Sequence, residues 1–253
     1  MATMTVAARD IEFSWVGDGR DDLPTLVMLH EGLGSVAMWR DFPGILARRT
    51  GCRVLVYSRH GYGRSARLQG ARAVSYMHDE ALLVLPELLD QLGIRRPLLL
   101  GHSDGGSIAL LYAARYPAAG VIALAPHVFV EDLSVQSIAA TKIAFQTTNL
   151  REKLARYHAD VDGAFWGWND IWLHPDFRAW NIESFLPEIQ CPILLIQGTE
   201  DEYGTEEQIV RIRRQARDVE ILHLPGCRHS PHRDQPERVL QAIGSWIEWV
   251  CAH

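Results

Sequence analysis

The stretch Leu98-Leu99-Leu100-Gly101-His102-Ser103-Asp104-Gly105-Gly106 decides the fold that we predict for this chain. Three consecutive leucines are typical of a buried strand, and a Gly-x-Ser-x-Gly pentapeptide follows them. From Ser107 to Tyr116 the pattern becomes helical, and Pro117 ends it. The pattern predicts a serine in a sharp strand-to-helix corner. Glycines are expected on both sides of it, because a β-carbon there would collide with the neighbouring strand or helix.

The helix predicted after this corner points its unpaired N–H groups and the positive end of its dipole at the space above Ser103. An anion that forms there is stabilised. Ser103 is therefore a candidate nucleophile, and the alternative interpretation is an ordinary glycine-rich β–α turn. A serine nucleophile also needs a base and an orienting acid, which must come from elsewhere in the chain in the order Ser, then Asp or Glu, then His.

The rest of the chain alternates between apolar runs of strand length and amphipathic helices. This alternation predicts the α/β class, with a doubly wound, mostly parallel sheet covered by helices on both faces. Ligand sites in such sheets lie beyond the carboxyl ends of the strands. Residues 5–15 are predicted to form one or two edge strands. The other predicted strands are 24–30, 53–58, 98–100, 121–125, 193–197 and 219–224, and the predicted helices are 39–49, 76–92, 206–217 and 236–250.

Residues 127–187 break this alternation, because no clear strand occurs between two core strands. Short helical patterns at 134–146 and 150–158 precede a cluster of aromatic residues. We interpret 127–187 as a helical cap over the strand ends, with 1–126 and 188–253 forming the core, since inserts of this length usually have their own function. Some tryptophans of the cluster are expected to line the substrate pocket, and the alternative is that they form the cap's own small core. The candidates for substrate binding are Trp166, Trp168 and Trp172.

An acid and a base follow two of the later strands. Glu200 and Asp201 come just after the strand at 193–197, and His229 lies in the loop after the strand at 219–224. All three therefore lie at the same sheet edge as Ser103. We favour His229 as the base and Asp201 over Glu200 as the acid that fixes its tautomer. The alternative bases are His232, His223 and His102.

An oxyanion hole needs two N–H groups directed at one point. The backbone of Asp104, the residue after the nucleophile, supplies one. The second is expected from the loop after the first buried strand, His30-Glu31-Gly32-Leu33-Gly34. Gly32 is the first choice and Leu33 the next, and a plain turn is the alternative.

Five motifs together resemble the α/β-hydrolase superfamily, and the resemblance covers the whole chain except the cap. The resemblance implies an eight-stranded, mostly parallel sheet, a helical cap after the sixth strand, and a catalytic triad of Ser103, Asp201 and His229. The motifs are Gly101-His102-Ser103-Asp104-Gly105-Gly106, His30-x-x-x-Gly34-Ser35 with Trp39 behind it, Arg59-x-Gly61-Tyr62-Gly63-x-Ser65, Gly198-x-x-Asp201 and His229-x-Pro231.

The chain departs from that superfamily at two carboxylates. Glu31 stands where glycine is more usual, and Asp104 stands where an apolar residue is more usual. Both would oppose negative charge in the oxyanion hole unless arginines or hydrogen bonds compensate them, and Arg59 and Arg64 are the candidates. We hypothesise that Glu31 is a structural residue or a contact for a substrate hydroxyl. Leu33 and His102 are further candidates for substrate binding.

Serine at the corner argues against haloalkane dehalogenase and epoxide hydrolase chemistry, which resembling enzymes perform with aspartate. The sequence predicts hydrolysis of a small to medium, aromatic or apolar carboxylic ester, thioester or lactone through an acyl-Ser103 intermediate. One alternative is hydrolysis of a C–C bond in a ring-cleavage product of aromatic-compound catabolism, with the anionic substrate bound by Arg151, Arg156 or Arg178. An alternative of another class is a non-catalytic fold that binds a ligand.

Composition and residue patterns argue against several other classes of protein and site. The chain has 253 residues and a formal net charge of −6, which argues against a nucleic-acid partner. Four scattered cysteines without a Cys-x-x-Cys pair indicate reduced thiols. The eleven histidines include no metal-binding pattern, so we expect neither a metal nor another cofactor. With no signal or membrane-spanning pattern, we expect a cytoplasmic monomer or homodimer with a small-molecule substrate and no membrane partner.

Overall fold

The computed structural model describes residues 2–253, which form an eight-stranded sheet in the order β1-β2-β4-β3-β5-β6-β7-β8. The first two strands form an antiparallel hairpin, β2 also pairs antiparallel with β4, and all other pairs are parallel. The predicted α/β class and mostly parallel sheet are confirmed. The strands are β1 (Ala2–Val6), β2 (Arg9–Val16), β3 (Leu26–Leu29), β4 (Val54–Tyr57), β5 (Leu98–His102), β6 (Gly120–Leu124), β7 (Ile193–Gly198) and β8 (Val219–Leu224).

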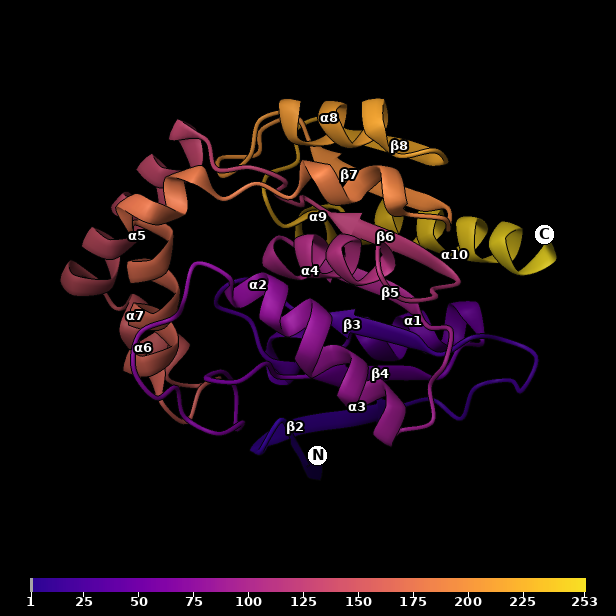
Figure 1. Cartoon of the computed structure of the whole chain (residues 1–253), viewed down its shortest axis with the longest axis horizontal. Helices are drawn as coiled ribbons and strands as arrows, with labels where there is room; N and C mark the ends of the chain where they lie inside the picture. Colours follow the sequence, from indigo (N-terminus) through magenta and orange to yellow (C-terminus); the bar gives the residue numbers. More distant parts are fainter. Residues whose placement is uncertain (1) are drawn as a thin grey trace.

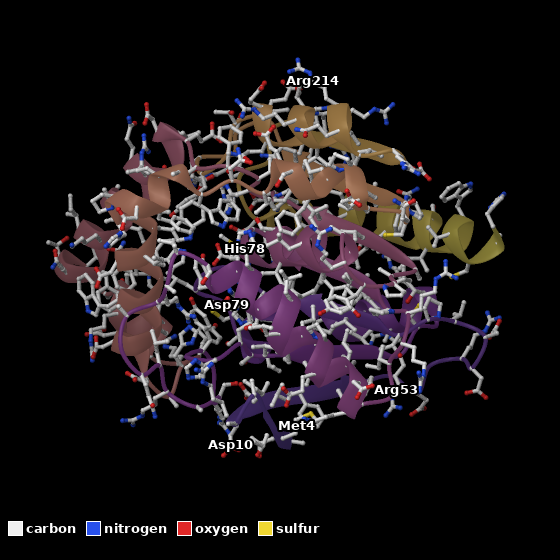
Figure 2. The ribbon with its side chains drawn as sticks, in the orientation of Figure 1. Met4, Asp10, Arg53, His78, Asp79 and Arg214 are labelled. Atoms are coloured by element: carbon white, nitrogen blue, oxygen red, sulfur yellow. The ribbon has the colours of Figure 1, made fainter. Side chains whose placement is uncertain are left out.

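Helices cover both faces of this sheet (Figure 1). The helices of the core are α1 (Phe42–Thr50), α2 (Tyr76–Asp79), α3 (Leu85–Gln91), α4 (Asp104–Ala113), α8 (Glu207–Gln215), α9 (Pro231–Asp234) and α10 (Pro236–Ala252), with the short 3₁₀ helix η1 (Val36–Trp39). Figure 2, in the same orientation, shows Arg214 on α8 and Asp10 on β2 at opposite edges of the molecule.

The two faces have separate hydrophobic cores because successive strand residues point to opposite sides. On β3, Val27 and Leu29 join the core under α2, α3, α4 and α8. Leu26 and Met28 join the core under α1 and α10. Both faces of the sheet are buried under helices. This explains why its strands consist of continuous apolar residues rather than of alternating apolar and polar residues.

Two local features depart from what the sequence pattern indicates. The β1–β2 hairpin turns through Ala7 and Ala8, whose φ angles are 48° and 59°, although neither residue is a usual turn former. The predicted helix at 76–92 contains one π-helical segment, η2 (Glu80–Val84). It lies immediately before Pro86, whose missing N–H already interrupts the helical hydrogen bonds.

Between β6 and β7 the chain leaves the sheet, and Figure 1 shows α5, α6 and α7 stacked beyond one end of it. The elements of this segment are α5 (Asp132–Thr147), α6 (Leu150–Leu154), α7 (Val161–Trp172), η3 (Pro175–Ala179) and η4 (Glu183–Glu188). In the described chain the only β-pairing within 127–187 is the bridge between Phe129 and Asn181. We refer to 127–187 as the cap, and its exact boundaries stay a prediction.

Helix α7 was not predicted from its aromatic residues, although a signal for it is present. Asp160 accepts a hydrogen bond of 3.0 Å from the backbone N–H of Gly163, which is the geometry of a helix N-cap. Phe165, Trp168 and Trp172 then recur at spacings of three and four and are buried.

The corner between β5 and α4 brings backbone into unusually close contact. A β-carbon on Gly101 would lie 2.1 Å from the carbonyl oxygen of Gly105. A β-carbon on Gly105 would lie 2.1 Å from the carbonyl oxygen of Leu29 on β3. The glycines predicted on either side of Ser103 are therefore required, because real β-carbon contacts are never this short and the atoms concerned belong to backbone.

We expect Gly105→Ala to lower the free energy of unfolding by about 3 kcal/mol, since helix and strand would have to separate. Gly244 on α10 is the matched control, because no atom lies within 4 Å of its β-carbon position. Gly244→Ala should raise the free energy of unfolding by up to about 1 kcal/mol through helix propensity. Urea denaturation followed by circular dichroism measures both. Equal, small effects at the two positions would contradict the close contact.

Candidate active site

Ser103 lies at the corner between β5 and α4 in a backbone conformation that side chains rarely adopt, with φ 54° and ψ −119°. The corner is fixed from both directions. The N–H of Ser103 donates to the carbonyl of Leu124 at 2.9 Å, and its carbonyl accepts from the N–H of Gly106 at 2.8 Å. Such strained positions persist where the surrounding structure determines them, and they are common at functional sites.

His229 connects Ser103 to Asp201. Nε2 of His229 lies 3.0 Å from Oγ of Ser103, and Nδ1 lies 2.8 Å and 3.0 Å from the two carboxylate oxygens of Asp201. A carboxylate accepts but does not donate, so Nδ1 carries the proton and Nε2 presents its lone pair to the serine hydroxyl. The three side chains come from the loops after β5, β7 and β8, as expected for the carboxyl edge of the sheet.

Asp201 is held in its ionised form. The N–H groups of Tyr203 and Gly204 donate to Oδ1 at 2.8 Å and 3.1 Å, and the amide of Gln197 donates to Oδ2 at 2.8 Å. Burial opposes ionisation of the carboxyl, but the charge and hydrogen bond of His229 and the N–H of Tyr203 lower its pKa below the ordinary value.

Among the described residues, the side chains of the alternative acid and bases form no hydrogen bond with the hydroxyl of Ser103. Glu200 is exposed, and only its backbone N–H is bonded, to the carbonyl of Cys227. His102 donates Nε2–H to the carbonyl of His229 at 2.7 Å. His223 is half-exposed beside Glu206, and His232 is buried between Trp39 and Phe42.

The two residues predicted to supply the oxyanion hole line the same cavity as Ser103. In the described chain, the backbone N–H groups of Gly32 and Asp104 donate to no backbone carbonyl, so both are free to bind an oxyanion. Gly32 is also covered closely by the cap. A β-carbon on it would lie 2.1 Å from the indole nitrogen of Trp168. This contact requires glycine at position 32 as long as the tryptophan is in place.

The carboxylate of Asp104 is compensated as expected by Arg59. The hydroxyl of Tyr76 donates to Oδ2 of Asp104 at 2.7 Å, and the buried guanidinium of Arg59 lies 3.6 Å from the same oxygen. Arg64 was the other candidate, and this prediction is wrong. Its side chain is exposed, and its backbone N–H donates to Glu12.

The carboxylate of Glu31 has partners that the sequence did not suggest. Its oxygens lie 3.6 Å from Nδ1 of His102 and 3.4 Å from the guanidinium of Arg233. Burial opposes ionisation of Glu31, but the proximity of His102 and the charge of Arg233 hold its pKa well below the ordinary value. Arg233 lies on α9, two residues after Pro231, and no local pattern links it to Glu31.

The cavity above Ser103 has a volume of about 130 Å³. Leu33, His102, Trp168 and Trp172 line it together with Glu31, as predicted for candidate substrate-binding residues, and Ile138 adds an apolar side chain from α5. The sequence analysis missed Ile138, His127, Tyr203 and Ser230, which complete the wall.

Trp166 does not line this cavity, which corrects its assignment as a substrate-binding candidate. Its ring packs edge-on against Phe145 and Phe165 at centroid distances of 5.7 Å and 5.1 Å. It borders a separate depression beside Leu68 and Arg72. The reason is helical geometry, because successive residues on α7 point about 100° apart, so Trp166 and Trp168 lie on different faces.

The sheet and the serine corner define the α/β-hydrolase class of folds. The sequence profile of the alpha/beta hydrolase family matches residues 26–242. The chain therefore belongs to the alpha/beta hydrolase family.

Relatives of the chain include two enzymes matched over most of their length. The sn-1-specific diacylglycerol lipase ABHD11 of Mus musculus is 26% identical, covering 91% of this chain and 83% of the lipase. A proline iminopeptidase of Lactobacillus helveticus is 28% identical, covering 90% and 91% of the two chains. A carboxylesterase structure from the archaeon Nitrososphaera gargenis has a TM-score of 0.79 at 20% identity over 98% of both chains. The enol-lactonase of Burkholderia xenovorans LB400 has a TM-score of 0.76 at 19% identity, covering 98% and 100%.

Within residues 2–253, no helix has both the length and the apolar character needed to cross a bilayer. Over the same residues, no group of three or more histidine, cysteine, aspartate or glutamate side chains is arranged to hold a metal ion.

The buried ring of His232 makes the free energy of unfolding depend on pH. Burial, followed by the proximity of His102, holds its pKa well below the ordinary value of about 6.5. Neither ring nitrogen has a hydrogen-bond partner among the described residues. The unfolded chain takes up a proton near pH 6.5 and the folded chain does not. The stabilising effect of the neutral ring is therefore complete above pH 6.5 and is lost as the pH falls toward the folded pKa.

We expect the free energy of unfolding of His232→Leu, relative to that of the wild type, to rise by about 1.4 kcal/mol between pH 7.5 and pH 5.5. Urea denaturation at pH 7.5, 6.5 and 5.5 measures this difference. His223→Gln, the exchange of a half-exposed histidine, is the control and should follow the wild type. A constant difference between wild type and His232→Leu over this range would show that the ring has the same pKa in the folded protein as in the unfolded chain.

Proposed function

We propose that the chain is a serine hydrolase that cleaves a small carboxylic ester through an acyl-Ser103 intermediate. The observation that carries the proposal is the continuous set of contacts from Asp201 through His229 to the hydroxyl of Ser103. Membership of a hydrolase family supports the reaction class. That the cleaved bond is an ester is part of the proposal, because the relatives include a lipase and a peptidase by name.

In the first step, Oγ of Ser103 attacks the carbonyl carbon while its proton passes to Nε2 of His229. The carbonyl oxygen becomes an oxyanion, which the N–H groups of Gly32 and Asp104 stabilise. Asp201 stabilises the imidazolium without taking the proton. When the tetrahedral intermediate collapses, the ester C–O bond breaks and His229 protonates the leaving alkoxide. Water then repeats the sequence on the acyl-enzyme and releases the acid.

The size of the cavity supports a small substrate portion. A cavity of roughly 150 Å³ accepts a molecule the size of benzene, and the space above Ser103 is about 130 Å³. Trp168, Trp172 and Ile138 make one wall apolar. We infer that the portion bound there has about the size of a single six-membered ring. Esters, thioesters and lactones offer the same electrophilic carbon, so a substrate panel has to separate them.

Hydrolysis of a C–C bond in an anionic ring-cleavage product has less support. That reaction would require Arg151, Arg156 or Arg178 to bind the anionic substrate in the cavity. All three side chains are exposed and none lines the cavity. Arg151 pairs with Asp162, and Arg178 pairs with Asp132. We therefore do not propose this activity.

We expect Ser103→Ala to lower kcat/KM by several orders of magnitude while changing the free energy of unfolding little. A panel of aryl esters, thioesters, lactones and a ring-fission diketone measures activity, and a fluorophosphonate probe measures labelling of the serine. The partly buried Ser75, whose hydroxyl donates to Asp79 in its own helical turn, provides the control Ser75→Ala, which should be labelled like the wild type. A wild-type protein that is neither labelled nor active would favour the non-catalytic ligand-binding alternative.

Asp201→Asn and Glu200→Gln test the assignment of the acid. We expect Asp201→Asn to lower kcat by about four orders of magnitude, because an amide favours the wrong tautomer of His229. Glu200→Gln should retain kcat within a few-fold, since its side chain has no contact with His229. Steady-state kinetics on the best ester of the panel measure both. A larger loss in Glu200→Gln than in Asp201→Asn would exclude the assignment.

A further inference from the structure

His127 forms part of the cavity wall, and the proposed mechanism does not use it. Its side chain is 2% exposed and lines the same cavity as Ser103 and His229. Its ring centroid lies 5.7 Å from that of His229 and 5.1 Å from that of Trp172. A group bound against His127 is therefore close to the carbon that Ser103 attacks.

The backbone around His127 is fixed by hydrogen bonds. Oγ of Ser107 accepts from the N–H of His127 at 3.1 Å and donates to its carbonyl at 2.5 Å. The next residue is held as well, because the N–H of Val128 donates to the side chain of Gln208 at 2.8 Å. The backbone that carries the imidazole is thus held by the core of the protein.

The imidazole itself lacks partners, in contrast to its backbone. Nδ1 of His127 is fully buried, has no hydrogen-bond partner among the described residues and is closed off from the cavity. Nε2 has no partner among these residues either, but it is not fully buried. Buried polar groups in folded proteins almost always have a partner. An imidazole with an unpaired Nε2, on a fixed backbone in the wall of a cavity beside a nucleophile, is a group available to a ligand.

The charge of this ring restricts what it binds. Burial, followed by the proximity of His229, lowers the pKa of His127 to about 4. At neutral pH the ring is uncharged and offers one N–H donor and one lone pair. Glu31 places a carboxylate in the same wall, which disfavours an anionic ligand. A hydroxyl or ether oxygen suits this environment better than a carboxylate.

We propose that His127 determines specificity by hydrogen-bonding a neutral oxygen substituent, a hydroxyl or ether, close to the carbonyl group attacked by Ser103. The inference rests on the proposed function and deepens it. The preferred substrates are esters of small oxygen-substituted acids rather than of the corresponding hydrocarbon acids. Trp172 and Ile138 contact the carbon atoms of the same acyl group.

Two isosteric esters test this proposal. p-Nitrophenyl methoxyacetate and p-nitrophenyl butyrate have the same leaving group and acyl chains of the same length, and they differ by one oxygen in place of a methylene. The measured quantity is the ratio of kcat/KM for methoxyacetate to that for butyrate. Comparing this ratio between variants cancels the intrinsic reactivity of the two esters.

We expect His127→Leu to lower the ratio about tenfold, as the loss of one hydrogen bond predicts. His127→Gln, which keeps a donor and an acceptor, should retain most of it. His223→Leu makes the same exchange at a half-exposed histidine outside the cavity and is the matched control, with an unchanged ratio. The rate of fluorophosphonate labelling of Ser103 and circular dichroism show whether each variant is folded. If His127→Leu does not fold, the same ratio is compared between His127→Gln and a second polar variant, His127→Ser. The ratio should be lower in His127→Ser, and equal ratios would overturn the role of His127.

The outcomes separate the two proposals. An unchanged ratio in a folded, active His127→Leu would overturn the role of His127 and leave the serine hydrolase intact. A ratio lowered equally in His223→Leu would show that the effect does not come from the cavity and would overturn the role too. Absence of labelling and of hydrolysis of both esters by the wild type would overturn the proposed function, and the role of His127 with it.

Discussion

The first turn of α4 lies against the backbone of β3, and the rest of the site depends on this contact. Only the missing side chain of Gly105 allows it, because the carbonyl oxygen of Leu29 occupies the place of a β-carbon. The contact forces Ser103 into its left-handed conformation and holds its hydroxyl above the sheet edge. It also directs the first N–H groups of α4 toward the same space. The loops after β7 and β8 then need only bring Asp201 and His229 to a point that the core has already defined.

A buried arginine makes this corner compatible with its own negative charge. Asp104 places a carboxylate beside the region where we propose that an oxyanion forms, and alone it would oppose that charge. Arg59 lies 3.6 Å from it. The same guanidinium donates to the carbonyls of His30 and Glu31 at 3.3 Å and 2.9 Å. One side chain therefore compensates Asp104 and fixes the loop that carries Gly32, which explains the Arg59-x-Gly61-Tyr62-Gly63 motif better than charge compensation alone.

The sequence allowed the sheet and the serine corner to be predicted because their signals are local. Apolar runs, glycine spacing and strand-to-loop transitions at Ser103, Asp201 and His229 each lie within a few residues. The features that were missed depend on contacts between distant segments. Arg233 meets Glu31 across about two hundred residues of chain, and His127 becomes notable only because its ring has no partner in three dimensions. Trp166 was assigned to the cavity because α7 was not recognised as a helix, so the face of each tryptophan was unknown.

The close approach of Gly32 to Trp168 joins the oxyanion loop to the cap, beside the contact of His158 with the carbonyl of Leu33. A side chain at position 32 would require the indole at position 168 to move, so these two positions should constrain each other in evolution. A homologue that keeps the tryptophan in this place should keep the glycine. A homologue with a small residue at 168 is free to carry a side chain at 32, and the two columns of an alignment should covary accordingly.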